Sequence, residues 1–437
     1  MAKKPVKLKE WYKLDNAAKI FPGQNRSNWS NIFRFGVELN EKIDSGILEE
    51  AVRITLKRFP CFDVRIRRGL FWYYLEKNPN PAPPVNPDVN NPCRRVKWSE
   101  NGRFLFRVYF YENRISVEFY HALTDAYGAA HFAMTLVAVY LRLTGKQIPD
   151  GGMVLDINEK ASAEELEDAF PRFVDKRYPA KAERQKKFVY HYRGTRLPDH
   201  HVNVTTGYIP VDKIKEKAKE YGVTVTEFLA AVMLFSMYRI ALREGKTDRE
   251  VSVQVPVNLR NTFNTKTLRN FSLCYSVRIN PQKGEYTFAE VLHAVSHYLK
   301  YINTEKELRA MINGNLGLEN NLLARLMPLW LKNLGINIAF HITGEQSVSG
   351  MVSNVGILKC PEEMLPYVSR VMLMAGPGVI NGSRCACVTW GNTLAVTLTN
   401  IYEQTDIQRE FFTSLVKMKI PVKIESNRRN GHAETEG

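Results

Sequence analysis

Hydrophobic and polar positions follow two different patterns along the first third of the chain, helical spacing and strand-like alternation. Apolar residues recur at helical spacing in SGILEEAVRITLKRF, and Pro60 ends that pattern. Alternating segments then predict a strand on each side of a turn at Gly69, and RFLFRVYFY with RISVEFYH predicts a hairpin around Glu112 and Asn113. Between the two pairs, NPNPAPPVNPDVNNP predicts a loop without regular structure. Residues 126–143 read as a mostly apolar helix.

A second series of elements begins near residue 203, after a polar and charged stretch. VNVTTGYIP predicts a strand, followed by a short amphipathic helix and a long buried helix capped by Thr224 or Thr226. Further alternating and helical segments continue to DIQREFFTSLVKMK. Strands interleaved with helices in both halves predict an α/β or α+β fold. We divide the chain into an N-terminal lobe (1–175), a connector (176–202) and a C-terminal lobe (203–437).

Composition and cysteine usage indicate a protein of the reducing cytoplasm. The mean hydropathy of the 437 residues is −0.30, and no apolar segment follows the basic start as in a signal peptide. The run FLAAVMLFSMYRIAL is shorter than a bilayer requires, so we expect no membrane span, although peripheral contact stays open. The six cysteines form no C-x-x-C motif, and Cys385 and Cys387 are interpreted as packed thiols.

The excess of basic over acidic residues indicates which classes of partner the protein could bind. Lysine and arginine number 61 against 45 acidic residues, a net charge of +16 that favours nucleic acid, an anionic membrane or a phosphorylated co-substrate. The basic residues are spread over strands and helices without a stripe, which counts against nucleic acid.

Metal chemistry has one candidate motif. His293 and His297 lie one helical turn apart, a spacing that can bind a metal, but neither an H-E-x-x-H glutamate nor a third ligand accompanies them. We therefore predict no metal. P-loop and G-x-S-x-G motifs are also absent from the sequence.

The segment FYHALTDAYGAAHF contains candidate catalytic residues at the junction between a predicted strand and a predicted helix. His121 ends the strand, and a neutral imidazole there can accept a proton at neutral pH. Asp125 is short enough to hold the turn or pair with an arginine, and Gly128 permits close backbone approach. The alternative is structural: a histidine satisfied by local hydrogen bonds, with Asp125 as a helix N-cap.

YHALTDAYGA resembles the His-x-x-x-Asp-Gly signature of the acyl-CoA-dependent acyltransferase superfamily. That superfamily includes chloramphenicol acetyltransferase, peptide-synthetase condensation domains, wax ester synthases and alcohol acetyltransferases. Other similar stretches follow in the superfamily's order, and LDNAAKIFP resembles the start of bacterial alcohol acetyltransferase-like proteins, the nearest branch. The remaining matches are LEEAVRITLKRFPCFDVRI, VTVTEFLAAVMLFSMY, VPVNLR with LRNF, and VSNVG.

The sequence departs from the superfamily at several positions. Ala126 and Tyr127 displace the glycine of the signature to Gly128. Tyr120 stands where condensation domains have the first of two histidines, and Asp63 stands where they have an arginine. These departures count against a carrier-protein substrate.

The resemblance implies two chloramphenicol-acetyltransferase-like lobes with a channel between them. His121 would be the general base and Asp125 would organise its loop, through an ion pair with Arg260. Gly128 and Asn270 would support the site. The segment VSNVG supplies the candidate oxyanion or channel residues, Ser353 and Asn354.

The reaction implied is transfer of an acetyl or other short acyl group from acyl-CoA to a small alcohol, without a covalent acyl-enzyme. Acyl-CoA is then a co-substrate, and no bound cofactor is expected. Two alternatives stay open. One is a condensation-type enzyme that uses a carrier-bound acyl group with an amine or hydroxyl acceptor, and the other is an inactive binding module of the same fold.

Overall fold

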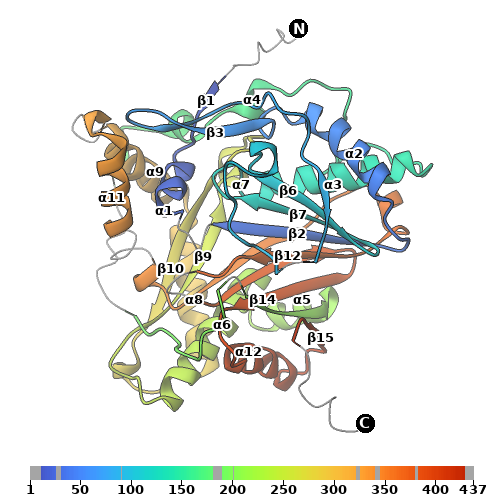
Figure 1. The fold of residues 1–437 in the computed structure, drawn as a ribbon. Helices are drawn as coiled ribbons and strands as arrows, with labels where there is room; N and C mark the ends of the chain where they lie inside the picture. Colours follow the sequence, from blue (N-terminus) through green and yellow to red (C-terminus); the bar gives the residue numbers. More distant parts are fainter. Residues whose placement is uncertain are drawn as a thin grey trace.

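Two mixed β-sheets pack face to face at the centre of the protein, through strand β12 on one side and strands β13 and β14 on the other (Figure 1). The structure is a computed structural model. It describes residues 11–25, 31–89, 91–180, 189–199, 201–320, 325–339, 345–378 and 382–428. The predicted connector, 176–202, therefore lies partly outside the described residues.

The first sheet has five strands and is covered by two helices, α2 (Ser45–Arg58) and α3 (Ala126–Leu143). Its strands in spatial order are β12 (Val368–Ala375), β2 (Ile32–Leu39), β7 (Arg114–Tyr120), β6 (Phe106–Tyr111) and β5 (Val85–Pro87). Both helices and the β6–β7 hairpin lie where the apolar pattern predicts them. Asp44 begins α2 by accepting from the backbone N–H of Ile47 at 3.0 Å.

The proline-rich loop contains a short strand, which corrects the prediction that it has no regular structure. Val85 is buried, and β5 runs parallel to β6 at the edge of the sheet. Proline is tolerated there because an edge strand leaves one row of its backbone groups outside the ladder.

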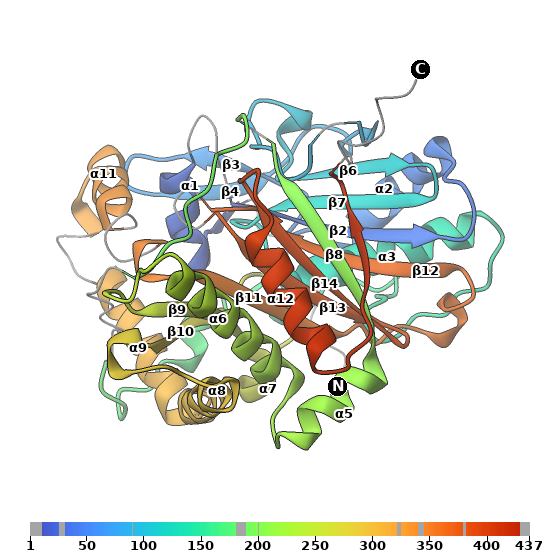
Figure 2. The same cartoon turned by 90° about the horizontal axis from the view of Figure 1, so that it is seen from below.

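The second sheet has seven strands and carries most of the C-terminal half. In spatial order they are β10 (Ser272–Ile279), β9 (Val251–Asn258), β11 (Gly350–Ile357), β13 (Arg384–Trp390), β14 (Thr393–Asn400), β8 (Asn203–Pro210) and β15 (Lys423–Ser426). The face turned away from the first sheet is covered by helices (Figure 2). They are α5 (Val211–Glu220), α6 (Val225–Arg243), α8 (Phe288–Ile302) and α12 (Asp406–Lys417).

The remaining elements are short or peripheral. A three-stranded sheet has the order β1 (Trp11–Lys13), β4 (Tyr73–Lys77), β3 (Val64–Arg68). The other α-helices in the described ranges are α1 (Phe21–Gln24), α4 (Ala163–Leu166), α7 (Arg260–Phe263), α9 (Glu305–Asn320) and α11 (Leu329–Ala339). The 3₁₀ helices are η1 (Ala17–Ile20), η2 (Asn101–Arg103), η3 (Phe170–Phe173), η4 (Pro281–Lys283), η6 (Glu345–Ser347) and η7 (Glu362–Met364).

Strand β13 separates the two hydrophobic cores. Cys385 and Cys387 face the helical core, while Ala386 and Val388 face the core shared with the first sheet. This is the two-residue alternation of a strand buried on both faces. The two thiols are free, and their sulfur atoms lie 3.7 Å apart.

Strand β12 joins the lobes. Although it belongs to the C-terminal part of the sequence, it pairs antiparallel with β2 of the N-terminal half, beside which it lies in Figure 1. The indole N–H of Trp390 donates to the carbonyl of Val368 at 2.9 Å, which fixes the start of β12 to β13. The ranges 1–175 and 203–437 therefore do not correspond to two separate sheets.

Among the residues that the structure describes, two helices are long and apolar enough to cross a bilayer by length and composition, α3 with 18 residues and α6 with 19. The run FLAAVMLFSMYRIAL, which we considered too short to span a bilayer, is part of a longer helix, α6, with 19 residues. The absence of a membrane span therefore stays a prediction. Both helices lie mostly inside the fold, with 78% and 72% of their apolar windows buried.

Candidate functional site

His121 lies at the seam between the halves, directly after β7. Its backbone N–H donates to the carbonyl of Asn31 at 2.8 Å, so the β2–β7 pairing extends to the residue itself. The imidazole stacks on Phe21 of α1 at 4.7 Å between ring centroids and lies 5.1 Å from Phe33 of β2. Part of the residue stays accessible. Burial lowers the pKa of His121 from its ordinary value, so the ring is neutral at pH 7.

The side-chain amide of Asn270 fixes the tautomer of this ring. Its Nδ2 donates to Asp15 Oδ2 at 3.2 Å and to the carbonyl of His121 at 3.0 Å. Both amide hydrogens therefore have acceptors, and the amide oxygen is the atom that faces His121 Nδ1 at 3.0 Å. Nδ1 must carry the proton, which leaves the lone pair on Nε2.

Asp15 anchors the amide of Asn270 from the N-terminal segment. It is fully buried and accepts the backbone N–H of Ala18 at 2.8 Å. Arg269 Nη2 lies 3.6 Å from Asp15 Oδ2 and donates to the carbonyl of Lys13 at 2.6 Å. Burial raises the pKa of Asp15, and the Arg269 charge opposes that shift. The resemblance covers this residue within LDNAAKIFP, but no role was predicted for it.

Asp125 has both arrangements that the sequence suggested. Its Oδ1 accepts the backbone N–H groups of Tyr127 and Gly128 at 3.2 and 3.3 Å, which makes it the N-cap of α3. Its Oδ2 lies 2.8 Å from Arg260 Nη1, so the expected ion pair is present. The same oxygen accepts the backbone N–H of Phe271 at 2.9 Å. The carboxylate thus ties the start of α3 to two segments of the other half.

Arg260 is buried and held by several acceptors besides Asp125. Its Nε donates to the carbonyl of Thr267 at 2.9 Å, and Nη1 donates to Asn258 Oδ1 at 3.1 Å. The guanidinium also lies over the ring of Tyr127 at 4.4 Å. These contacts orient the cation before any substrate is present.

At Gly128 the helix α3 lies close to the backbone of the other half. A Cβ built there would lie 2.1 Å from the carbonyl oxygen of Leu268 and 2.3 Å from Thr124 Oγ1. The Thr124 hydroxyl donates to the same Leu268 carbonyl at 2.6 Å. The close backbone approach predicted for this glycine is therefore present, and a larger residue would force the segments apart.

Ser353 and Asn354 lie on β11, and the structure does not join them to the imidazole. Asn354 Nδ2 donates to Thr226 Oγ1 at 3.0 Å, and its Oδ1 accepts the backbone N–H of Gly356 at 2.9 Å. Thr224 is the N-cap of α6, with a capping box to Glu227, which leaves the Thr226 hydroxyl to Asn354. A part for these two residues in an oxyanion site stays a prediction.

The described ranges contain no group of three or more His, Cys, Asp or Glu residues placed to hold a metal ion. His293 and His297 lie on the exposed side of α8 with their Nε2 atoms 2.9 Å apart, and they bond to each other. This pair forms a surface contact away from the imidazole of His121.

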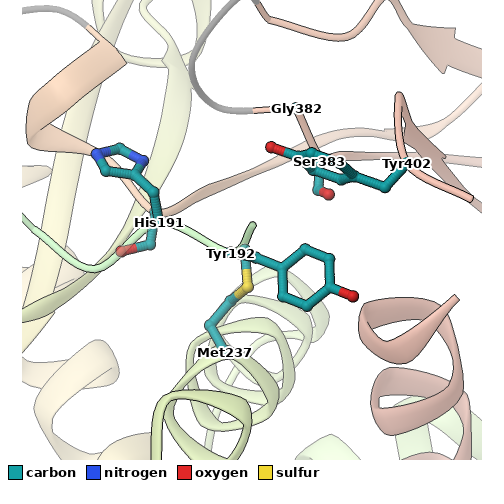
Figure 3. Close-up of a pocket in the computed structure, with 7 residues that line it drawn as sticks. His191, Tyr192, Met237, Gly382, Ser383 and Tyr402 are labelled. Atoms are coloured by element: carbon teal, nitrogen blue, oxygen red, sulfur yellow. The ribbon is translucent and has the colours of Figure 1, made fainter. Parts of the chain in front are cut away.

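A small hollow opens beside α6 in the second lobe (Figure 3). It is lined by His191, Tyr192, Met237, Ser349, Gly382, Ser383 and Tyr402. Its empty volume, which includes space open to solvent, is about 160 Å³. His121 is not among the lining residues, so we assign the hollow no part in the chemistry.

No protein-family model and no curated protein sequence matches the chain. Solved structures match it over nearly its whole length. TRI101 of F. sporotrichioides, complexed with coenzyme A and T-2, superimposes with a TM-score of 0.64 at 11% identity and covers 95% of this chain and 99% of that one. Polyketide synthase associated protein 5 from Mycobacterium tuberculosis superimposes with a TM-score of 0.60 at 13% identity, covering 93% of this chain and 97% of that one.

The first condensation domain of the CDA synthetase superimposes with a TM-score of 0.57 at 14% identity, covering 92% of this chain and 94% of that one. The chain therefore has the two-lobed fold shared by TRI101 and condensation domains. The fold predicted from the sequence is confirmed.

Proposed function

We propose that this protein transfers an acyl group from acyl-CoA to the hydroxyl of an alcohol, with His121 as the general base. The observation that carries the proposal is the bond between His121 Nδ1 and the Asn270 amide oxygen, which leaves Nε2 as the basic atom. The lowered pKa keeps that atom unprotonated at neutral pH. The fold is that of TRI101, which was solved with coenzyme A, and this supports a CoA thioester as donor.

The proposed reaction is a direct transfer between the two substrates. His121 Nε2 takes the proton from the hydroxyl of the alcohol. At the same time the alcohol oxygen attacks the thioester carbonyl carbon and forms the new C–O bond. The tetrahedral intermediate then collapses, the C–S bond breaks, and Nε2 returns the proton to the departing thiolate. The products are an ester and free CoA, and the histidine ends in its starting state.

The neighbouring residues would act by position. Asp125 and Arg260 would hold the loop that carries His121, and Gly128 would let α3 reach the other half. We keep Ser353 as the first candidate to stabilise the oxyanion. Asn354 would first have to give up its bond to Thr226.

Free thiol released from a panel of acyl-CoAs, with and without a panel of alcohols, tests the proposal. We expect release to require both substrates and to fall by about 10²–10⁴ in His121→Ala. The exposed His293→Ala variant is the matched control and should keep full activity. Near wild-type turnover by a folded His121→Ala protein would overturn the mechanism. Ligand binding without turnover in either protein would favour the inactive binding module.

A condensation-type reaction is the second candidate, because the first condensation domain of the CDA synthetase shares the fold. Tyr120 in place of that family's first histidine counts against it. An acyl-CoA donor carries several phosphate charges, so the KM for acyl-CoA should rise with ionic strength as the screening length falls from about 10 Å at 0.1 M to about 3 Å at 1 M. An acyl pantetheine without the nucleotide is the control. Equal use of both donors without a salt effect would favour a carrier-bound donor.

A further inference from the structure

Helix α11 turns its polar side toward the protein. Asn333 Nδ2 donates to the hydroxyl of Tyr73 at 3.0 Å, and Asn337 Nδ2 donates to the carbonyl of Gly23 at 2.7 Å. The ammonium of Lys332 is buried as well, and it lies 3.5 Å from the centre of the Trp72 ring. These polar side chains attach the helix to α1 and to the β3–β4 hairpin.

The opposite side of α11 is apolar and faces solvent. Trp330, Leu334 and Ile338 follow one another at four-residue spacing and are 63%, 54% and 52% exposed. A surface helix of a soluble protein normally has the reverse arrangement, with its apolar stripe toward the core. The apolar side of α11 is therefore exposed because the polar side makes the contacts with the rest of the protein.

Further exposed apolar side chains lie on the segment that adjoins the start of the helix. The backbone N–H of Leu329 donates to the carbonyl of Leu70 at 3.0 Å, which brings the tip of the β3–β4 hairpin against the start of α11. The exposed side chains of the two segments form what we call the α11 face: Leu70, Phe71, Leu326, Trp330, Leu334 and Ile338. Figures 1 and 2 both show α11 at one end of the molecule beside α1.

The two segments that form the α11 face carry basic side chains, and Glu76, which follows the first segment, pairs with Arg65 and Arg67. Residues 64–75 and 325–338 contain arginine and lysine but no aspartate or glutamate. Arg68 and Arg325 are exposed, and within the described part of the chain neither forms an ion pair. The face thus combines projecting apolar side chains with a basic rim.

We propose that the α11 face docks on the surface of an anionic phospholipid bilayer. Tryptophan, leucine and isoleucine beside basic residues are the composition of helices that lie in the membrane interface. With 11 residues, α11 is about 16 Å long, too short to span a bilayer of about 30 Å. A second copy fits less well, because an isologous contact would bring the basic residues of two identical faces to the same interface.

Vesicle flotation of the full chain tests the proposal independently of the reaction. We expect binding to phosphatidylcholine vesicles that contain phosphatidylglycerol, weak binding to phosphatidylcholine alone, and release at about 1 M salt. Trp330→Ser with Leu334→Ser should weaken vesicle binding by at least about tenfold, and Arg68→Gln with Arg325→Gln should remove the preference for anionic lipid. Val416→Ser, which alters a similarly exposed side chain on α12 (56%), should change nothing.

Three results would overturn the proposal. One is a folded wild-type protein that floats with neither vesicle, and another is undiminished binding by the Trp330/Leu334 variant. The third is a dimer in analytical ultracentrifugation that the same variant abolishes, which would assign the face to a second copy. Because no acyl substrate is involved, failure here would leave the proposed reaction untouched, and acyl transfer to soluble alcohols should persist in the Trp330/Leu334 variant.

Discussion

Asn270 and Asp15 are joined by a hydrogen bond of 3.2 Å from Nδ2 to Oδ2, and this contact, together with the bond from Nδ2 to the carbonyl of His121, sets which atom of the amide faces the imidazole. If the amide were reversed, its NH₂ would point at Nδ1 and favour the other tautomer, with the proton on Nε2. A buried carboxylate from the start of the chain thus controls the basic atom of the candidate site through one intervening side chain.

We expect Asp15→Asn to keep more activity than Asp15→Ala. Both variants remove the charge that faces Arg269, so both should lose thermal stability. The asparagine oxygen can still accept from Asn270, whereas alanine cannot. We therefore expect kcat in Asp15→Ala to fall by about 10-fold or more, which is part of the 10²–10⁴ that a general base supplies, with KM less affected. Equal kcat values in the two variants would show that Asp15 acts only on stability.

The pH dependence of kcat/KM should show an acidic limb governed by His121. A general base must be unprotonated, so activity rises with pH through the pKa of the imidazole and then levels off. Burial lowers that pKa below its ordinary value of 6.5, so the limb should lie below pH 6.5 and the rate should be flat around pH 7. A midpoint above pH 7 would contradict both the burial and the assigned role.

Asp125→Asn and Arg260→Gln should each lower stability, by about 3–5 kcal/mol, because each leaves one buried charge uncompensated. The double variant should lose less than the sum of the two, since the unpaired charge is then absent. A denaturant-unfolding cycle measures the difference as a coupling free energy. Strict additivity would mean that the contact at 2.8 Å contributes nothing.

Gly128→Ala should lower both stability and activity. The new methyl group would meet the backbone carbonyl of Leu268 at 2.1 Å, which cannot rotate away as a side chain could. Gly317→Ala is the matched control, because it also lies in a helix but has no atom within 4 Å of the added carbon. That control should stabilise the protein by up to about 1 kcal/mol. Equal melting temperatures for the two variants would contradict the close packing.

His131 should make the protein less stable in acid. It is buried in α3, its Nδ1 lies 3.0 Å from the carbonyl of Met153, and burial lowers its pKa to about 4. The unfolded chain binds a proton near pH 6.5, whereas the folded state resists it, so stability is lost as pH falls from about 6.5 towards 4. The loss is at most about 3 kcal/mol. The melting temperature of His131→Leu should depend less on pH in this range, and the exposed His201→Leu should behave as wild type.

Local pattern was sufficient to predict much of the site. The β6–β7 hairpin and helix α3 follow from alternation and helical spacing, so His121 at the strand end and Asp125 at the helix start could be placed from residues alone. Their connection to Arg260 came from the resemblance. In these segments the sequence determines the result because hydrogen bonds and side-chain spacing within one hairpin or helix select it.

The tertiary structure decided the features that depend on distant partners. Asp15 and Asn270 are separated by 255 positions, and nothing in either segment indicates the other. The pairing of β12 with β2 and the outward apolar side of α11 also depend on distant parts of the chain, which the local sequence does not indicate. Periodicity predicts which face of an element is apolar, but the surface that face meets, or whether any surface covers it, is set by how the whole chain packs.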